Sequence, residues 1–558
     1  MHWDVGIAMR DGTRLAGTLY LPAKHLAPTP AIVAMTPYIG QVCHEQAVYF
    51  AAHGYPFVAV DVRGRGNSQG VFHPLNEIKD SHDVVQWLAT QPFCDGKVAM
   101  WGGSYSGYVQ WAATKELASN LRTIVPVAAP FRGGDSPLRN NIFSPYTVQW
   151  LTLIAGRALQ DKIFADRSFW SAQFAQWFAS GSSFKALDAL LGNPSPIFQE
   201  WLSHPHRDEY WDGYNPTAQE YARVSIPVLT VTGIYDANQL GSLMHYRAHL
   251  KHCSPAARKR HYLVIGPWDH AGTRVPRSEF AGLKVGPASL VDLPKLHRQW
   301  YAWTMQGAPR PEFLKNNVVY YVMVAERWCY ADSLESVTAR IERLYLHSTR
   351  NPTDVFMSGS LCAELRDCLR PDEYRYDPRD VRHIDLEREV DQDNLVDQRL
   401  LHAMTGRLLI YHSASCAQAR EIAGFFRLSL WLSIDQPDTD FHVSIYDVAA
   451  DGSAVRLGAD TLRARYRESP YKQRLIETRD ALRYDFEHFP FVARRIEAGH
   501  RLRLVIGALN SIHWQKNYNS GGDVSEETLA DARPVTVRLF HDASRPSALE
   551  VPFGQLEC

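Results

Sequence analysis

The sequence predicts an α/β domain that is interrupted by a helical insertion and followed by an all-β domain. Over residues 1–130 and 222–310, short apolar runs typical of buried parallel strands alternate with helical segments. Residues 131–221 have helical periodicity and many aromatic side chains, with no buried-strand run. Residues 311–558 contain alternating strands separated by turn residues, the pattern of a sandwich or jelly roll.

The first part of the α/β domain begins with a strand-like alternation over residues 14–22. Four short apolar runs that end in turn residues predict buried strands at 30–38, 56–64, 97–102 and 122–130. Residues 80–92 have helical spacing, which brings Val84, Trp87 and Leu88 to one face. Strand and helix therefore alternate up to the insertion.

After the helical insertion the buried-strand pattern resumes at 226–236 and 260–270, and 290–307 has the pattern of a closing helix. In the C-terminal domain, strands are predicted at 316–328, 341–348, 407–414, 424–434, 440–452, 501–509 and 533–541. The polar stretch 367–398 is expected to be a long loop.

The composition excludes some classes of partner. The 558 residues carry a formal net charge of -1, so neither nucleic acid nor an anionic membrane is predicted as a partner. No apolar run approaches the roughly 18 residues of a membrane span, and the N-terminus has no signal-like pattern. The eight cysteines are scattered without metal-ligand spacing. We therefore expect a cytoplasmic protein with reduced cysteines and no metal or cofactor; its oligomeric state stays open, a homo-oligomer included.

The segment 97–111, KVAMWGGSYSGYVQW, has the pattern of a strand, a sharp turn and the start of a helix. A serine nucleophile commonly sits on such a turn in the pattern G-x-S-x-G, but here the last glycine comes one residue late. Ser104 directly follows the strand, at the helix N-terminus, where the dipole favours negative charge. Ser106 lies about 200° further around the first helical turn. We interpret Ser104 as the nucleophile, and Ser106 and Gly107 as small packing residues.

A serine nucleophile needs a base and a carboxylate that orients the base. In a large class of α/β enzymes they follow in the order serine, acid, histidine, each just after the carboxyl end of a strand. Asp236 and His270 fit that order and those positions. An N-cap role also explains Asp236, and the two roles are compatible. Asp269 is less suited, because the acid normally comes from a different strand than the histidine.

GGSYSGY resembles the G-x-S-Y-x-G elbow of the cocaine-esterase-like and X-Pro dipeptidyl-peptidase group of α/β-hydrolases, in which the late glycine is common. Further segments resemble that group in the same order, at 35–40, 61–70, 204–212, 233–238, 266–272, 438–452, 462–469 and 510–523. The resemblance spans nearly the whole chain. It implies an α/β-hydrolase fold with an inserted helical cap and a C-terminal jelly-roll domain.

The resemblance also implies an oxyanion hole. In that group the tyrosine of a T/N-P-Y loop donates its hydroxyl to the oxyanion, and the corresponding residue here is Tyr38. The second donor would be the backbone N–H of Tyr105, which follows the nucleophile. Without the resemblance, Tyr38 would be interpreted as a packing residue at a strand end. Arg63, in the segment 61–70, is expected to pair with a carboxylate.

Aromatic residues of the predicted cap are candidates for the walls of a substrate pocket. They are Trp150, Trp170, Phe174, Trp177 and Phe178. For any single one of them, a place in the cap's own core is the better explanation. The group's α-amino-acid ester hydrolases carry acidic residues shortly after the triad acid, but residues 237–239 are not acidic here. A substrate with a free α-amino group is thus disfavoured, unless Asp208 or Glu209 supplies the charge.

Together, these observations predict a serine hydrolase that cleaves a small-molecule carboxylic ester or amide through an acyl-enzyme. Two alternatives use the same chemistry: an acyltransferase or cyclase, in which an amine or alcohol intercepts the acyl group, and an X-Pro-type dipeptidyl peptidase. A third alternative is a binding module of the β-domain attached to an inactive hydrolase domain. The intact order of serine, acid and histidine argues against it.

Overall fold

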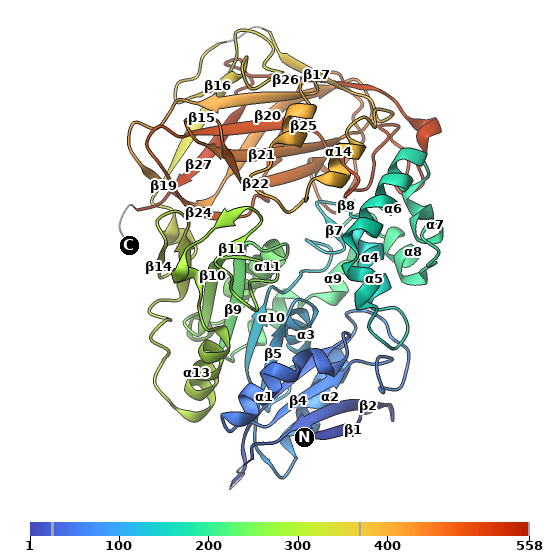
Figure 1. The fold of residues 1–558 in the computed structure, drawn as a ribbon, viewed down its shortest axis with the longest axis vertical. Coiled ribbons are helices and arrows are strands. Elements are labelled where there is room, and N and C mark those ends of the chain that lie inside the picture. Colours follow the sequence, from blue (N-terminus) through green and yellow to red (C-terminus); the bar gives the residue numbers. More distant parts are fainter. Residues whose placement is uncertain (24–26, 368–369, 556–558) are drawn as a thin grey trace.

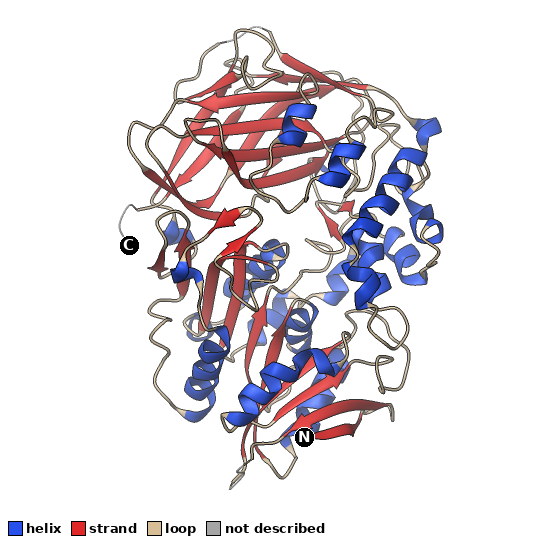
Figure 2. Cartoon of the chain, viewed as in Figure 1, coloured by secondary structure: helices blue, strands red, loops and turns tan. Residues whose placement is uncertain are grey.

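The structure is a computed structural model that describes residues 1–23, 27–367 and 370–555. It contains an α/β domain, a helical cap and a β-domain, in the order that the sequence predicts (Figure 1). Figure 2 shows helices packed around the strands of the α/β domain, a cap made mostly of helices, and a β-domain made mostly of strands.

The α/β domain is built on a sheet of ten strands. In spatial order they are β1 (His2–Ala8), β2 (Arg14–Tyr20), β4 (Phe57–Asp61), β3 (Thr29–Thr36), β5 (Cys94–Gly103), β6 (Leu121–Val127), β9 (Val228–Tyr235), β10 (His261–Asp269), β13 (Val318–Val322) and β14 (Arg327–Ala331). From β4 to β13 neighbouring strands are parallel, whereas the pairs β1–β2, β2–β4 and β13–β14 are antiparallel. The buried-strand and helix predictions for this domain are therefore confirmed.

Helices cover both faces of this sheet. Alternate side chains of a strand point to opposite faces, so Val33 of β3 packs in one apolar cluster and Ile32 in the other. The helices on the face of Val33 are α2 (Ile78–Ala89), α3 (Tyr105–Ala113) and α11 (Gln239–His252). On the other face lie α1 (His44–Ala52) and α13 (Leu293–Gln306).

The insertion between β6 and β9 forms the cap. It starts with the hairpin of β7 (Leu138–Arg139) and β8 (Ile142–Phe143). Seven helices follow: α4 (Tyr146–Leu153), α5 (Asp161–Ala165), α6 (Arg167–Ser180), α7 (Leu187–Leu190), α8 (Pro196–Leu202), α9 (Glu209–Tyr214) and α10 (Ala218–Arg223). The longest of these, α6, begins where the Asp166 carboxylate accepts the Phe169 N–H and ends at Gly181, at a φ of 69°.

The α/β sheet continues beyond residue 310, the predicted end of the α/β domain. The segment 316–328 was expected in the β-domain, but β13 pairs in parallel with β10, and β14 completes the edge of the α/β sheet. A short apolar strand has the same pattern in either sheet, so periodicity could not assign it.

Cys329 of β14 is disulfide-bonded, which contradicts the expectation of reduced cysteines throughout.

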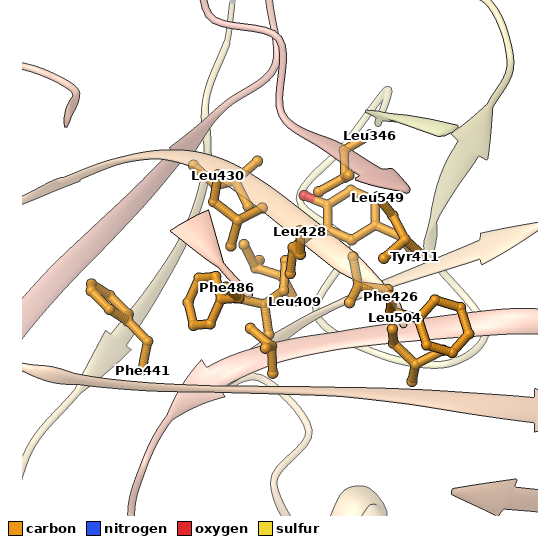
Figure 3. Packing of buried hydrophobic residues seen from close by; sticks show 14 of the residues in the cluster. Leu346, Leu409, Tyr411, Phe426, Leu428, Leu430, Phe441, Phe486, Leu504 and Leu549 are labelled. Carbon is orange, nitrogen blue, oxygen red and sulfur yellow. The ribbon is translucent and has the colours of Figure 1, made fainter. Parts of the chain in front are cut away.

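The β-domain is one sheet of thirteen strands that folds over on itself. The strands are β15 (Arg340–His347), β16 (Gly359–Cys362), β17 (Asp372–Tyr376), β18 (Leu408–Ser413), β19 (Arg420–Phe425), β20 (Arg427–Ile434), β21 (Asp440–Val448), β22 (Ala454–Arg463), β23 (Leu482–Phe486), β24 (Phe491–Ile496), β25 (Arg501–Ala508), β26 (Val535–Phe540) and β27 (Ala548–Phe553). Leu428 of β20 and Leu409 of β18 belong to strands that are not neighbours, yet they pack into one core (Figure 3).

Within 367–398, the structure departs from the expected long loop. The segment contains β17, which pairs with β26, and the helix α14 (Ile384–Glu389), which packs against α6 of the cap. A further short helix, α15 (Arg399–Ala403), follows it. Among the described residues, no helix combines the length and the apolar character that crossing a membrane requires.

Candidate active site

Ser104 lies in the sharp turn between β5 and α3. Its φ of 60° and ψ of -121° are unusual for a residue with a side chain, as expected of a strained strand-to-helix elbow. Only glycine fits three residues later, because a methyl group on Gly107 would lie 2.6 Å from the carbonyl oxygen of Val127. The Ser106 hydroxyl donates a hydrogen bond to the carbonyl oxygen of Met35 at 2.7 Å. Ser106 and Gly107 thus hold α3 close to the sheet, as predicted.

The turn brings Ser104 to His270 and, through it, to Asp236. His270 Nε2 lies 3.1 Å from Ser104 Oγ, and His270 Nδ1 lies 2.7 Å from Asp236 Oδ1. Ser104 follows β5, Asp236 follows β9 and His270 follows β10. These strands are parallel, so their carboxyl ends lie at one edge of the sheet. The structure therefore joins the three predicted side chains in one hydrogen-bonded chain.

The Asp236 carboxylate is fully buried and is held on both oxygens. The Thr232 hydroxyl donates to Oδ2 at 2.8 Å, and the Asn238 N–H donates to Oδ1 at 3.0 Å. Asn238 itself is the N-cap residue of α11, so the cap role considered for Asp236 falls two residues later. Asp269 instead accepts hydrogen bonds from Arg277, at 2.5 Å, and from the backbone N–H of Gly272.

Tyr38 lies next to Ser104, in the loop that follows β3. The indole Nε1 of Trp150 donates a hydrogen bond to its hydroxyl at 3.0 Å. Burial raises the pKa of Tyr38, while this hydrogen bond, the positive charge of Arg274 and the Ser104 side chain oppose the rise. The phenol is therefore neutral near pH 7 and carries a proton that it can donate.

Tyr105 has its backbone at the site and its side chain behind it. It is the first residue of α3, so its N–H has no acceptor within the helix. Its hydroxyl donates to the Glu77 carboxyl and accepts from the Leu75 N–H at 2.7 Å. Burial raises the pKa of Glu77 to about 8. The side chain thus anchors the turn, and the N–H stays available beside Ser104.

Of the aromatic residues predicted in the cap, the structure brings Trp150 into contact with Tyr38. The other candidates do not lie in this contact. Trp170, Phe174 and Trp177 are buried in the cap core together with Phe178. The indole N–H of Trp170 donates to the carbonyl oxygen of Ile163. The indole N–H of Trp177 donates to the carbonyl oxygen of Ser183. These contacts assign them to the packing of the cap.

Sequence reasoning missed several residues around the site. Trp201 stacks on Trp150, with ring centroids 6.2 Å apart, and the guanidinium of Arg132 lies 4.5 Å above the Trp201 ring. Arg65 is fully buried and donates to the carbonyl oxygens of Pro37, next to Tyr38, and Ile154 of the cap. The glycine-rich pattern around Arg65 was the available signal.

Two other predictions concern the surroundings of the site. Arg63 forms a bidentate ion pair with Asp80: its Nη2 lies 2.6 Å from Oδ1 and its Nε 3.0 Å from Oδ2. Its expected pairing with a carboxylate is therefore confirmed. Within the described residues, no group of three or more His, Cys, Asp or Glu side chains could hold a metal ion. The site is built from the side chains and backbone described above.

Both halves of the chain match known families. Residues 11–272 match the X-Pro dipeptidyl-peptidase (S15 family), and residues 314–550 match the X-Pro dipeptidyl-peptidase C-terminal non-catalytic domain. The chain is 26% identical over 578 positions to the cocaine esterase of Rhodococcus sp. (strain MB1 Bresler), with 98% of each protein covered.

Solved structures share the whole architecture. One is an aminopeptidase from the marine sediment archaeon Thaumarchaeota archaeon, with a TM-score of 0.82, 22% identity and coverage of 98% of this chain and 95% of that one. Another is an α-amino acid ester hydrolase, with a TM-score of 0.83, 20% identity and coverage of 99% and 96%. At these identities the likeness establishes the fold.

The family matches cover the α/β domain and the β-domain in turn, and the curated relative spans both of them. This protein is accordingly a serine hydrolase and belongs to the cocaine-esterase-like and X-Pro dipeptidyl-peptidase group of α/β-hydrolases.

Proposed function

We propose that this protein cleaves a carboxylic ester or amide through an acyl-enzyme on Ser104, with His270 as base and Asp236 as the residue that orients it. The observation that carries the proposal is the position of His270, which hydrogen-bonds to both partners at once. Relatives named as an esterase, an aminopeptidase and an amino acid ester hydrolase all act at a carboxyl carbon, which supports the reaction class.

Proton positions follow from the partners of each atom. Asp236 Oδ1 already accepts the Asn238 N–H, and a carboxylate only accepts, so His270 Nδ1 carries a proton. In a neutral imidazole, Nε2 is then an acceptor, directed at the hydroxyl proton of Ser104. His270 takes that proton as Oγ attacks the carbonyl and returns it to the leaving group. The buried charge of Asp236 stabilises the imidazolium in between.

The oxyanion would be held by the Tyr38 hydroxyl and the Tyr105 N–H. Trp150 donates to the Tyr38 oxygen, which leaves the phenolic proton free to point at the substrate oxygen. The Tyr105 N–H is at the N-terminus of α3, where the helix dipole also favours negative charge. Water then attacks the acyl group, with His270 again as base, and frees Ser104.

A fluorophosphonate probe tests this proposal, because it phosphonylates only an activated serine. We expect labelling at Ser104 in the wild type, no labelling of Ser104→Ala, and labelling of Ser106→Ala close to the wild-type rate. Circular dichroism would verify that both variants are folded. Labelling of Ser104→Ala at the wild-type rate, or no labelling of folded wild-type protein, would refute the proposal.

Water is the proposed acceptor of the acyl group. Product analysis with and without added amines or alcohols tests that part separately. Free acid in both conditions supports hydrolysis. Products that form only when an amine or alcohol is present would make the enzyme an acyltransferase or cyclase, with the role of Ser104 unchanged.

A further inference from the structure

Arg274 lies beside the strand end that carries the nucleophile. A methyl group placed on Gly103 would lie 3.6 Å from both Cγ and Cδ of Arg274. Gly103 is bonded to Ser104, and Arg274 follows His270 in the loop after β10. Together with covalent lengths, these contacts limit the distance from the guanidinium to Ser104 Oγ to the order of 10 Å.

Arg274 is an exposed residue, and its guanidinium lies within electrostatic range of two tyrosines. Its positive charge acts on the hydroxyl of Tyr38, in the loop after β3, and on that of Tyr146, the first residue of α4 in the cap. In Tyr38 it opposes the rise in pKa that burial causes. Tyr146 is half exposed, at 50%.

Among the described residues, no carboxylate pairs with Arg274. Asp269 is taken up by Arg277 and Asp236 by His270. Asp393 comes from the β-domain and also acts on Tyr146, but the cations that act on its own carboxyl are Arg167 and Arg456. Within the part of the chain that the structure describes, the Arg274 guanidinium is therefore not neutralised by an ion pair.

We infer that Arg274 binds an anionic group of the substrate, a carboxylate close to the scissile carbonyl; this rests on the proposed function of Ser104. A planar guanidinium matches a carboxylate through two parallel hydrogen bonds. Residues 237–239, after the triad acid, contribute no acidic side chain, so that loop adds no group for a cationic substrate. The substrate class is thus a carboxylic ester or amide that bears a second, free carboxylate.

Another role for Arg274 would be to stabilise the oxyanion for every substrate. The two roles differ in what a neutral substrate experiences. A specificity residue affects only the anionic member of a matched substrate pair, whereas a general electrostatic role affects both members equally. Paired substrates therefore separate the two.

The experiment compares kcat/KM for two pairs. One pair is the 4-nitrophenyl monoester of glutaric acid and 4-nitrophenyl pentanoate, which place the charge in the acyl part. The other is the acetate esters of 4-hydroxybenzoate and 4-hydroxybenzamide, which place it in the leaving group. In at least one pair, we expect the wild type to prefer the anionic member, and Arg274→Gln to lower kcat/KM for that member about 10- to 100-fold. The neutral member should change by less than about threefold.

Arg277→Gln is the matched control. Arg277 lies in the same loop as Arg274 but already pairs with a carboxylate, that of Asp269. We expect this variant to retain the wild-type preference. Salt should weaken the preference of the wild type, since screening reduces the attraction between the charges.

Labelling with the fluorophosphonate probe distinguishes a failure of the Arg274 inference from a failure of the proposed hydrolase function. If Ser104 is labelled in the wild type and Arg274→Gln, and the variant loses rate equally on both members or on neither, this inference is wrong and the hydrolase stands. If folded wild-type protein is not labelled at Ser104, the proposed function fails and the inference fails with it.

Discussion

Charged side chains are buried in both the α/β domain and the β-domain, but at different distances from the reaction centre. In the α/β domain, the fully buried Asp236 carboxylate hydrogen-bonds to His270, which contacts Ser104. In the β-domain, Asp440 pairs with Arg463 through two contacts of 2.8 Å, and Arg463 also donates to the carbonyl oxygen of Asn141 at the start of the cap. The first arrangement orients the proposed general base, and the second joins two parts of the fold.

The difference teaches that a buried carboxylate does not by itself mark an active site. Asp440 and Asp236 are both buried, and each accepts from two or more donors. Their charged or titratable partners differ, since the His270 side chain is 30% exposed and the Arg463 side chain only 2%. Substitutions should therefore separate activity from stability in the two regions.

Asp236→Asn should have the largest effect, on activity alone. An amide in this position can donate to His270, which would favour the wrong tautomer, and we expect kcat to fall about 10⁴-fold. Thermal unfolding should change less than in Asp440→Asn, because asparagine still accepts from Thr232 and leaves no buried charge unpaired, although the Asn238 N–H loses its acceptor. Steady-state kinetics and calorimetry measure the two quantities. A large loss of stability together with wild-type kcat would reverse the roles assigned to the two regions.

Asp440→Asn should show the opposite pattern. Removing one charge of this buried pair takes the two-contact partner from Arg463 and costs about 3–5 kcal/mol in the free energy of unfolding. At a temperature where the variant is folded, kcat per site labelled by the probe should equal that of the wild type. Urea denaturation checks the first expectation. A variant as stable as the wild type would show that this pair does not hold the β-domain together.

Tyr38→Phe should lower kcat about 10²- to 10³-fold with the fold intact, because it removes one of the two proposed oxyanion donors. Trp150→Phe is the matched comparison: it keeps a ring but removes the N–H that donates to the Tyr38 hydroxyl. We expect a smaller loss, since the phenolic proton is then only less well directed. An effect of Trp150→Phe larger than that of Tyr38→Phe would argue against Tyr38 as the donor.

Glu77→Gln should have the smallest effect, on the pH dependence of stability. The pKa of Glu77 is about 8 in the fold, above its ordinary value, so the folded state binds a proton that the unfolded state releases. Its contribution is present in full below the ordinary pKa of a glutamate and is lost as the pH rises through about 8. The variant should lose this decline between pH 5 and 9, as measured by Tm. The exposed Glu487→Gln is the control, and parallel curves for Glu77→Gln and the wild type would disprove the assignment.

Local sequence patterns predict most of the α/β domain and the three residues that meet at its sheet edge. The buried strands, the late glycine and the order of Ser104, Asp236 and His270 are encoded within short segments, and parallel strands bring their carboxyl ends together. Apolar and aromatic content was less informative. It indicates that Trp170 is buried, but not that it packs inside the cap, and it cannot assign β13 to either sheet.

The residues that sequence reasoning missed depend on contacts between distant segments. Trp201 becomes relevant because it stacks on Trp150, and Arg65 because it joins the loop of Tyr38 to the cap. Arg274 has no motif of its own, and its position against Gly103 arises only because β5 and β10 end at the same edge of the sheet. Such roles follow from packing and not from the local sequence.

Direct detection of the acyl-enzyme tests the central claim. The protein would be mixed with a slowly hydrolysed activated ester, quenched in acid, digested and analysed by mass spectrometry. We predict the mass of the acyl group on the peptide that contains the nucleophile turn, fragment ions that assign it to Ser104, and its absence from Ser104→Ala. An acyl group on Ser106, or turnover without any acylated serine, would contradict the account.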